Sequence, residues 1–352
     1  MSKLINPYEN VDWSKQQKAN LHTHTKLITI DSTKYGSDDG SNTMAEVVDL
    51  YRNRGYKVLA FTDHDWGTAS QVTTYPPSIF GVDPDALGMV IIQGKEFSQG
   101  HHRNGLFCDL GVYTDDVSGS INAVQTRGGL AVINHPYVYT ETLEWYSLLF
   151  LRYKDVLVGL EVNNSKYVGN SIGLWDNLNA EVIPQGKTVF GYGNDDFHDT
   201  YTNVNIGHFR NYNFILSDLT ESSVRTAMEN GQTYFCKVAD GANDAPKITN
   251  IVVDSTSITI TADSGTVKWV TEGTVEVGTG GTFDYSGFDK SFVRAEITSS
   301  NGITCTQPFT FELLKEVVFR PKTMYNGELV ELKGHIVHNG VLSDVKSIRR
   351  YY

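Results

Sequence analysis

The sequence predicts an α/β barrel that is followed by an antiparallel β-sandwich and a short β-hairpin tail. Between residues 20 and 240, short apolar runs that end in polar residues alternate with helical patterns, which is typical of α/β proteins. From residue 244 onward, short alternating runs are separated by Gly, Asn, Asp and Ser, as in antiparallel sheets. These changes place the domain boundaries at 1–243, 244–315 and 316–352.

Five apolar runs of the first region are expected to form buried parallel strands. Each run is short and often β-branched, which suits strands that are covered on both faces. The runs occupy 57–64, 88–98, 129–136, 156–164 and 187–198. Helices are expected at 120–129, at 220–231 and at 41–55, where Ser, Asn and Thr open the pattern and Gly55 closes it.

The C-terminal regions are expected to be all-β. Residues 244–315 suggest a β-sandwich of roughly six strands. Residues 316–352 contain two Asn-Gly pairs between strand-like runs, and Asn-Gly favours a two-residue hairpin. The sequence leaves open whether this tail serves homo-oligomerisation or attachment to a larger assembly.

Composition excludes several classes of partner. The chain has 41 acidic and 29 basic residues, for a net charge of −12, and it shows no basic stripe, so we expect no extended nucleic-acid surface. No run approaches the roughly 18 apolar residues of a membrane span, and the N-terminus lacks a secretory apolar core. We therefore expect no membrane contact and a cytoplasmic location, with a virion location as an open alternative. Cys108, Cys236 and Cys305 are too dispersed for a zinc or disulfide framework and are expected to be buried thiols.

Histidines and carboxylates gather at the ends of the predicted strands. NLHTHT places two histidines at i and i+2, which puts both side chains on one face of a strand. In barrels the carboxyl ends of the strands carry the site. Imidazole and carboxylate ligands in such a cluster suit Zn, Mn or Fe. The candidate ligands are His22, His24, His64, Glu96, His101 or His102, His135, Asp196 and His198.

Taken in order, LHTHT, FTDHD, GKEFS, HRNGLF, INHP and NDDFH resemble the motifs of the PHP (polymerase and histidinol phosphatase) metal-dependent phosphoesterase superfamily. The resemblance spans about residues 20–235 and includes SSVRTAMENGQTYF, which is similar to the family's terminal helix and turn. It implies a distorted (β/α)7 barrel that holds two to three divalent ions of Zn, Mn or Fe. It also implies that a metal-bound hydroxide hydrolyses a phosphomonoester or phosphodiester, in a small phosphorylated substrate or a phosphodiester polymer.

The resemblance also implies roles for individual residues. The first ion would be held by His22, His24, Glu96 and Asp196, and Glu96 would bridge to a second ion that His102 and His135 complete. The third ion would take His64, His198 and an acid of the first motif. His102 is preferred over His101 because HRNGL matches the family's histidine three residues before Gly. Since KLITIDSTKYG is inserted before the acid, Asp39 is the best match, with Asp38 and Asp31 as alternatives. The catalytic assignments are Glu96, Asp196, His198 and Arg103.

Roles outside this ligand set are less specific. Asp63 and Asp65 are compatible with orienting ligands or with capping a strand–helix turn. Glu161 resembles a family position that faces the site, and Tyr and Asn of 163–171 are considered for the pocket wall. Arg103, Arg127, Arg210 and Lys95 are considered for phosphate contact, with Arg103 first because it adjoins His102. His208, His335 and His338 lie outside the motifs.

Two other functions compete with a phosphoesterase. An amidohydrolase-like enzyme would require a strand-end lysine, and none fits well. A non-catalytic scaffold would use the β-sandwich and the tail to bind a glycan or a larger assembly. Because the sequence keeps essentially the whole ligand set, we favour the enzyme.

Overall fold

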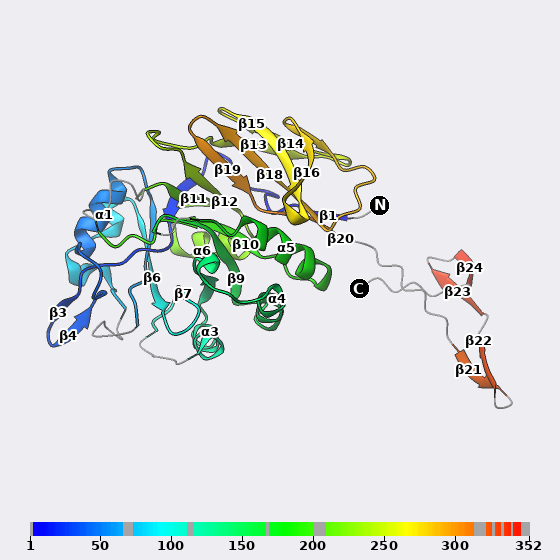
Figure 1. The fold of residues 1–352 in the computed structure, drawn as a ribbon, viewed down its shortest axis with the longest axis horizontal. Coiled ribbons are helices and arrows are strands. Elements are labelled where there is room, and N and C mark those ends of the chain that lie inside the picture. The colour runs from blue at the N-terminus through cyan, green and yellow to red at the C-terminus, as the bar shows by residue number, and fades with distance from the viewer. Residues whose placement is uncertain are drawn as a thin grey trace.

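The computed structural model describes residues 3–65, 73–110, 116–166, 169–199 and 209–312, and the backbone of four short strands between 322 and 345. Within these residues, a mixed 15-stranded sheet runs through the molecule. Helices lie against its N-terminal part, and antiparallel sheets make up the C-terminal part (Figure 1). The predicted change from α/β to all-β structure is confirmed. No helix within the described residues is long and apolar enough to cross a membrane.

All five predicted strands of the first region form. The strands of this part follow one another across the sheet in the order β11 (Asn211–Leu216), β2 (Gln16–Asn20), β5 (Val58–Phe61), β6 (Val90–Phe97), β7 (Arg103–Leu106), β8 (Leu130–Ile133), β9 (Leu157–Asn164) and β10 (Phe190–Asn194). The pairs β2–β5, β5–β6, β8–β9 and β9–β10 are parallel. In contrast, β7 runs antiparallel to both β6 and β8.

The three predicted helices also form. In α1 (Met44–Arg52), Thr43 and Glu46 make a reciprocal capping box, and the buried residues Met44, Val47, Val48 and Tyr51 recur at helical spacing. The other two are α3 (Val117–Thr126) and α6 (Glu221–Glu229). Helical segments that were not predicted are η1 (Pro77–Phe80), α2 (Pro84–Leu87), η2 (Pro136–Val138), α4 (Leu143–Arg152), α5 (Ile172–Val182), η3 (Ile183–Gln185) and η4 (Glu272–Thr274).

The C-terminal part consists of antiparallel sheets. One of them contains β13 (Ile248–Val253), β14 (Ser257–Ala262) and β17 (Thr282–Asp284). The remaining strands of this part belong to the large sheet. They are β1 (Lys3–Ile5), β12 (Thr233–Val238), β15 (Thr266–Thr271), β16 (Val275–Thr279), β18 (Phe292–Ser299), β19 (Gly302–Thr306) and β20 (Phe309–Glu312). Because β12 pairs with both β11 and β19, the large sheet crosses the predicted boundary at residue 244. That boundary remains a prediction.

Three short ladders lie outside these sheets. The first is a hairpin of β3 (Ile28–Ile30) and β4 (Thr33–Tyr35). In the tail, β21 (Lys322–Tyr325) pairs with β22 (Glu328–Glu331), and β23 (Gly334–His338) pairs with β24 (Val341–Val345). The Asn-Gly pairs between these tail strands lie outside the described residues.

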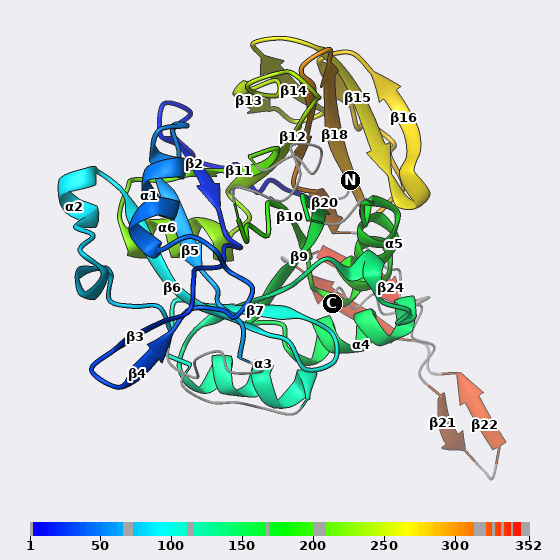
Figure 2. The same ribbon diagram turned by 60° about the vertical axis from the view of Figure 1, so that its left-hand side comes forward.

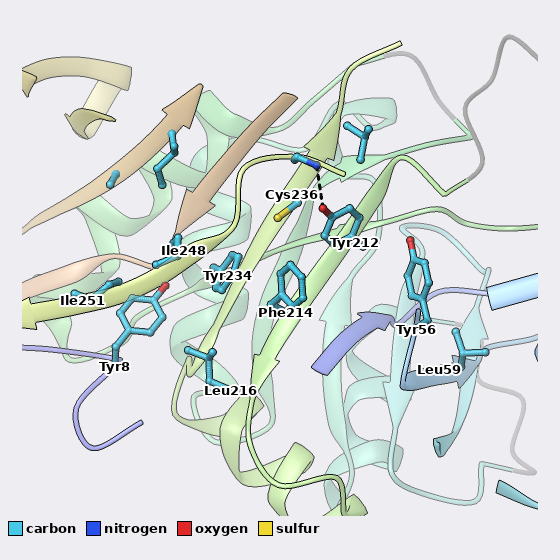
Figure 3. Close-up of a cluster of buried hydrophobic side chains, with 14 of the residues drawn as sticks. Tyr8, Tyr56, Leu59, Tyr212, Phe214, Leu216, Tyr234, Cys236, Ile248 and Ile251 are labelled. Atoms are coloured by element: carbon cyan, nitrogen blue, oxygen red, sulfur yellow. Dashed lines mark hydrogen bonds between the residues drawn. The ribbon is translucent and has the colours of Figure 1, made fainter. Parts of the chain in front are cut away.

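A hydrophobic core joins the two parts of the molecule. Tyr212, Phe214 and Leu216 alternate along β11 and point to one face, where they meet β12 and β13 (Figure 3). Two buried phenols of this core have polar partners: the Tyr212 hydroxyl accepts a hydrogen bond from Ala245 N at 3.1 Å, and the Tyr8 hydroxyl donates to Thr233 O at 2.9 Å. The three cysteines are buried and unpaired to one another, as expected.

Side-chain amides cover the outer edge of β10. In the described residues no backbone ladder joins β10 to β11, so closure into a (β/α)7 barrel is not established by strand pairing. Asn213 accepts from Gly193 N at 3.0 Å and donates to Gly193 O at 2.9 Å. Gln307 accepts from Gly191 N and donates to Gly191 O, both at 2.8 Å. Each amide offers the donor and acceptor of a peptide group, so the two residues replace a neighbouring strand.

We predict that Gln307→Ala lowers the free energy of unfolding by about 1–3 kcal/mol, because it leaves the buried N–H and C=O of Gly191 without partners. The measurement is urea unfolding. Gln185→Ala is the matched control, since the exposed Gln185 amide donates only to Glu181 O, and we expect a change within about 0.5 kcal/mol. Equal effects of the two substitutions would contradict this account.

Candidate metal centre

The predicted ligands lie at one edge of the sheet. Most of them end or follow a strand: His22 and His24 follow β2, His64 follows β5, Glu96 lies near the end of β6, His135 follows β8, and Asp196 and His198 follow β10. His102 instead precedes β7. Because β7 is antiparallel to its neighbours, its first residue lies at the edge where β6 and β8 end.

The first group of potential ligands is His22, His24, Glu96 and Asp196, all of them buried. His22 Nε2 lies 3.2 Å from Asp196 Oδ1 and 3.3 Å from Glu96 Oε2. His24 Nε2 lies 3.1 Å and 3.3 Å from the same two oxygens. Four ligand atoms therefore face one point, and this set is the one predicted for the first ion.

The second group is His24, Asp39, His64 and His198. Asp39 Oδ2 lies 3.0 Å from His198 Nε2 and 3.5 Å from His64 Nε2. The structure thus brings Asp39 to the place where the third predicted ion requires an acid, and it adds His24 to that set.

The inserted segment before Asp39 forms the β3–β4 hairpin, which projects from the N-terminal part of the molecule (Figure 2). Two glycines allow the returning chain to lie against residues 25–27. A Cβ at Gly36, where φ is +95°, would lie 2.3 Å from Lys26 O, and a Cβ at Gly40 would lie 2.1 Å from Thr25 O. The insertion therefore forms a projecting hairpin, and the chain that follows it returns to the site, where Asp39 lies.

Glu96 links the groups. Its Oε2 lies 3.0 Å from His64 Nδ1, on the same side as His22 and His24. Its Oε1 lies 3.1 Å from His102 Nδ1 and 3.4 Å from His135 Nε2. The residues predicted for the second ion, Glu96, His102 and His135, therefore meet at the other carboxylate oxygen.

One buried atom makes this cluster a candidate cation site. Glu96 Oε2 is buried and has no hydrogen-bond partner among the described residues, although three imidazole nitrogens lie within 3.0 to 3.3 Å. A buried carboxylate oxygen without a partner is costly. A divalent ion shared with these imidazoles would satisfy it, so the donor set fits Zn, Mn or Fe.

Two of the potential ligands have unusual backbone conformations. His135 has φ of 27° and Asp196 has φ of 52°, both in the left-handed region. Non-glycine residues adopt such conformations at a cost of about 1–3 kcal/mol, and they concentrate at functional sites. The fold holds both residues in conformations that turn the chain sharply after β8 and β10.

Buried polar residues position the imidazoles. Glu161 Oε1 lies 2.7 Å from His22 Nδ1, and Glu161 also accepts hydrogen bonds from His135 N, Asn164 and Asn194. Such a carboxylate–histidine contact fixes the tautomer and orientation of a ligand. Glu161 therefore lies behind His22, and not in the cavity.

The aspartates next to the motifs hold the loops in place. Asp63 accepts from Thr25 N at 2.6 Å and from Ser37 Oγ at 3.2 Å, and Asp65 accepts from Ser98 N at 2.9 Å. Ser37 in turn contacts His24 Nδ1 at 3.2 Å, so Asp63 acts on a potential ligand through one residue.

The charges of the cluster stabilise one another. Burial lowers the pKa of His22, but Asp196, Glu96 and Glu161 together raise this pKa well above its usual value. Burial raises the pKa values of Glu96 and Asp196, but His22 and the other imidazoles hold both well below the usual range. The two carboxylates are therefore ionised and available as ligands.

Arg103 makes its hydrogen bonds to nearby loop and helix residues. The sequence favours it as a catalytic, phosphate-contacting residue, and that role remains a prediction; in the structure its side chain is buried. It donates to Gln99 O, His101 O, Asp116 O and Ser120 Oγ at 2.5 to 2.9 Å. Because these bonds engage all three guanidinium nitrogens, Arg103 supports the loop that carries His102.

The remaining candidate residues that the structure describes contact other groups. His101 contacts the Tyr146 hydroxyl at 2.7 Å and His102 O at 3.1 Å, and burial lowers its pKa to about 3. Lys95 is buried beside Glu96, Arg127 is exposed at the end of α3, and Arg210 pairs with Asp240. His208 and Tyr167 lie outside the described residues, as do the side chains of His335 and His338.

A cavity of about 350 Å³ opens onto the cluster, and its wall includes residues that the sequence analysis did not identify. It is lined by Asp39, His64, Glu96, Ser98, Gln99, His102, His135, Lys166 and Asp196. Ser98, Gln99 and Lys166 were not predicted. Ser98 is the last residue of the motif GKEFS, and Ser98 and Gln99 directly follow β6. Lys166 lies in the segment 163–171, two residues after β9, so position relative to a strand end is the available signal.

No family model matches the sequence, and no curated protein matches it. Among solved structures, one from Bacteroides vulgatus ATCC 8482 is similar, a two-domain protein containing a predicted PHP-like metal-dependent phosphoesterase. It is 16% identical, and the match covers 85% of this chain and 96% of that chain with a TM-score of 0.50. An amidohydrolase from Chromobacterium violaceum, with bound sulfate and no metal, is 17% identical over 54% of this chain and 90% of that chain. Its TM-score of 0.36 carries no weight for the fold.

The Bacteroides structure matches most of this chain and nearly all of its own, through both the α/β part and the antiparallel part. The fold of this chain is therefore similar to that of the Bacteroides protein, in agreement with the resemblance that the sequence motifs indicate.

Proposed function

We propose that the chain is a metal-dependent hydrolase that cleaves a phosphate ester, either a monoester or a diester. The observation that carries the proposal is the convergence of five imidazoles on the two oxygens of the buried Glu96. The likeness to the fold of a PHP-like protein supports it. The proposal includes a distorted (β/α)7 barrel in which Asn213 and Gln307 replace the missing ladder between β10 and β11.

The proposed centre takes two to three ions of Zn, Mn or Fe. His22, His24, Glu96 and Asp196 would hold the first, and Glu96 with His102 and His135 would hold the second. Asp39, His64 and His198 would hold the third. When bound, such ions lower the pKa of a coordinated water and neutralise the phosphoryl oxygens during displacement.

The chain's own residues prepare the ligand atoms. Glu161 Oε1 contacts His22 Nδ1 at 2.7 Å, which turns Nε2 of the same ring toward the cluster. His198 Nδ1 donates to Asp196 O at 2.8 Å, which turns His198 Nε2 toward Asp39. Ser98 Oγ lies 2.6 Å from His64 Nδ1 and fixes that ring. These contacts set the imidazoles before any ion or substrate binds.

The cavity sets the size of the substrate group that can reach the cluster. At about 350 Å³ it suits a small phosphorylated molecule or one unit of a phosphodiester polymer. Lys166 lies in its wall and supplies a positive charge for an anionic substrate. The proposal includes both a small phosphorylated molecule and a phosphodiester polymer. Comparing the turnover of a model monoester with that of a model diester distinguishes cleavage of the two ester types.

We predict that the purified chain hydrolyses an aryl phosphate monoester or an aryl phosphodiester in the presence of Mn or Zn. A chelator should abolish turnover, and added metal should restore it, because the ligands surround the cavity. Glu96→Gln should lower kcat by about 100-fold or more, since it removes the residue that links the groups. Glu229→Gln is the matched control, because Glu229 is exposed on α6, where it pairs with Arg225.

Turnover that survives chelation, or that Glu96→Gln and Glu229→Gln change equally, would contradict the proposed reaction. Absence of both turnover and bound metal in the unaltered chain would favour the non-catalytic scaffold.

We also predict that Glu161→Gln weakens metal binding by about 10- to 100-fold without unfolding the protein, because it loses the charge that orients His22. Metal affinity is measured by titration calorimetry, and circular dichroism reports the fold. An unchanged affinity would show that Glu161 has no influence on the ligands.

A further inference from the structure

Lys166 lies where the second ligand group opens into the cavity. It follows β9, and its backbone N donates to Asn164 Oδ1 at 2.9 Å, which shapes the start of the loop. Its side chain is 34% exposed and lines the cavity beside Asp39. Among the described residues of the cavity wall, it is the one lysine or arginine.

The contact between Lys166 and His198 defines the state of that imidazole. Lys166 Nζ lies 2.7 Å from His198 Nε2. An ammonium group only donates hydrogen bonds, so Nε2 must be the acceptor and must offer its lone pair. The contact of the other ring nitrogen is consistent with this assignment, since Nδ1 donates to Asp196 O at 2.8 Å.

Asp39 adds a second electron-rich atom at the same place. Its Oδ2 lies 3.0 Å from His198 Nε2 and 3.8 Å from Lys166 Nζ. A carboxylate oxygen and an imidazole lone pair at this separation repel each other unless a positive charge faces both. The ammonium of Lys166 is that charge, and it is located at the ligand atoms that the third ion would use.

An imidazole nitrogen has one lone pair, and it can bind either a hydrogen-bond donor or a metal ion. The contact with Lys166 and a bond from His198 Nε2 to a metal therefore exclude each other. The contacts of Lys166 with His198 and Asp39 both fall in the second ligand group.

We propose that the ammonium of Lys166 takes the place of the third cation, so that the resting protein holds two divalent ions and a third binds only when Lys166 withdraws. This inference rests on the proposed function, since it assumes that the first two sites bind metal. The length and partial exposure of the Lys166 side chain allow the withdrawal without a change in the strands.

The test is the metal content of the chain after dialysis against excess Mn or Zn, measured by mass spectrometry of the metals. We expect about two ions per chain for the unaltered protein and about three for Lys166→Met, which keeps the length of the side chain but removes its charge. Lys34→Met is the control for loss of charge, because Lys34 is exposed on the β3–β4 hairpin, and we expect about two ions.

Three ions in the unaltered chain, or two in both the unaltered chain and Lys166→Met, would overturn the inference and leave the proposed function standing. Absence of metal from all three proteins would overturn both.

Discussion

The structure depends on keeping one carboxylate, Glu96, buried among imidazoles. Its two oxygens face different partners. Oε2 faces His22, His24 and His64, and Oε1 faces His102 and His135. Burial of so many ionisable groups is unfavourable unless their charges compensate. In the protein alone, the imidazoles and carboxylates compensate one another in part, and divalent ions would complete the compensation. The same arrangement explains why Glu161 and Asp63 lie behind the ligands, where they hold the rings in place.

The C-terminal sheets reach the same cluster through β10. Gln307, beyond β19, bonds to Gly191, and Asn213 bonds to Gly193, three residues before Asp196. A second link is the buried Arg294, which makes two bonds of 2.6 and 2.8 Å to Asp176 in α5. The antiparallel part therefore stabilises the strand and the helix next to the site, which gives it a structural role in addition to any binding role of its own.

Much of the site could be predicted because parallel strands end at one edge of a sheet, so polar residues after successive strands converge. The strand β7 was not predicted, since its sequence RNGL has a single large apolar residue and does not form an apolar run, yet its antiparallel direction is what brings His102 to the edge. Arg103 is adjacent to a ligand in sequence but points inward, because its guanidinium meets carbonyls of its own loop. Gln307 is 116 residues from Gly191, and no local pattern reports such a contact.

The central claim is that both oxygens of Glu96 face bound metal, and diffraction from crystals soaked in Mn or Zn tests it most directly. Anomalous difference density should show one peak among His22, His24, Asp196 and Glu96 Oε2, and a second beside Glu96 Oε1 near His102 and His135. Absence of a peak at either oxygen, in crystals that contain the metal elsewhere, would contradict the account.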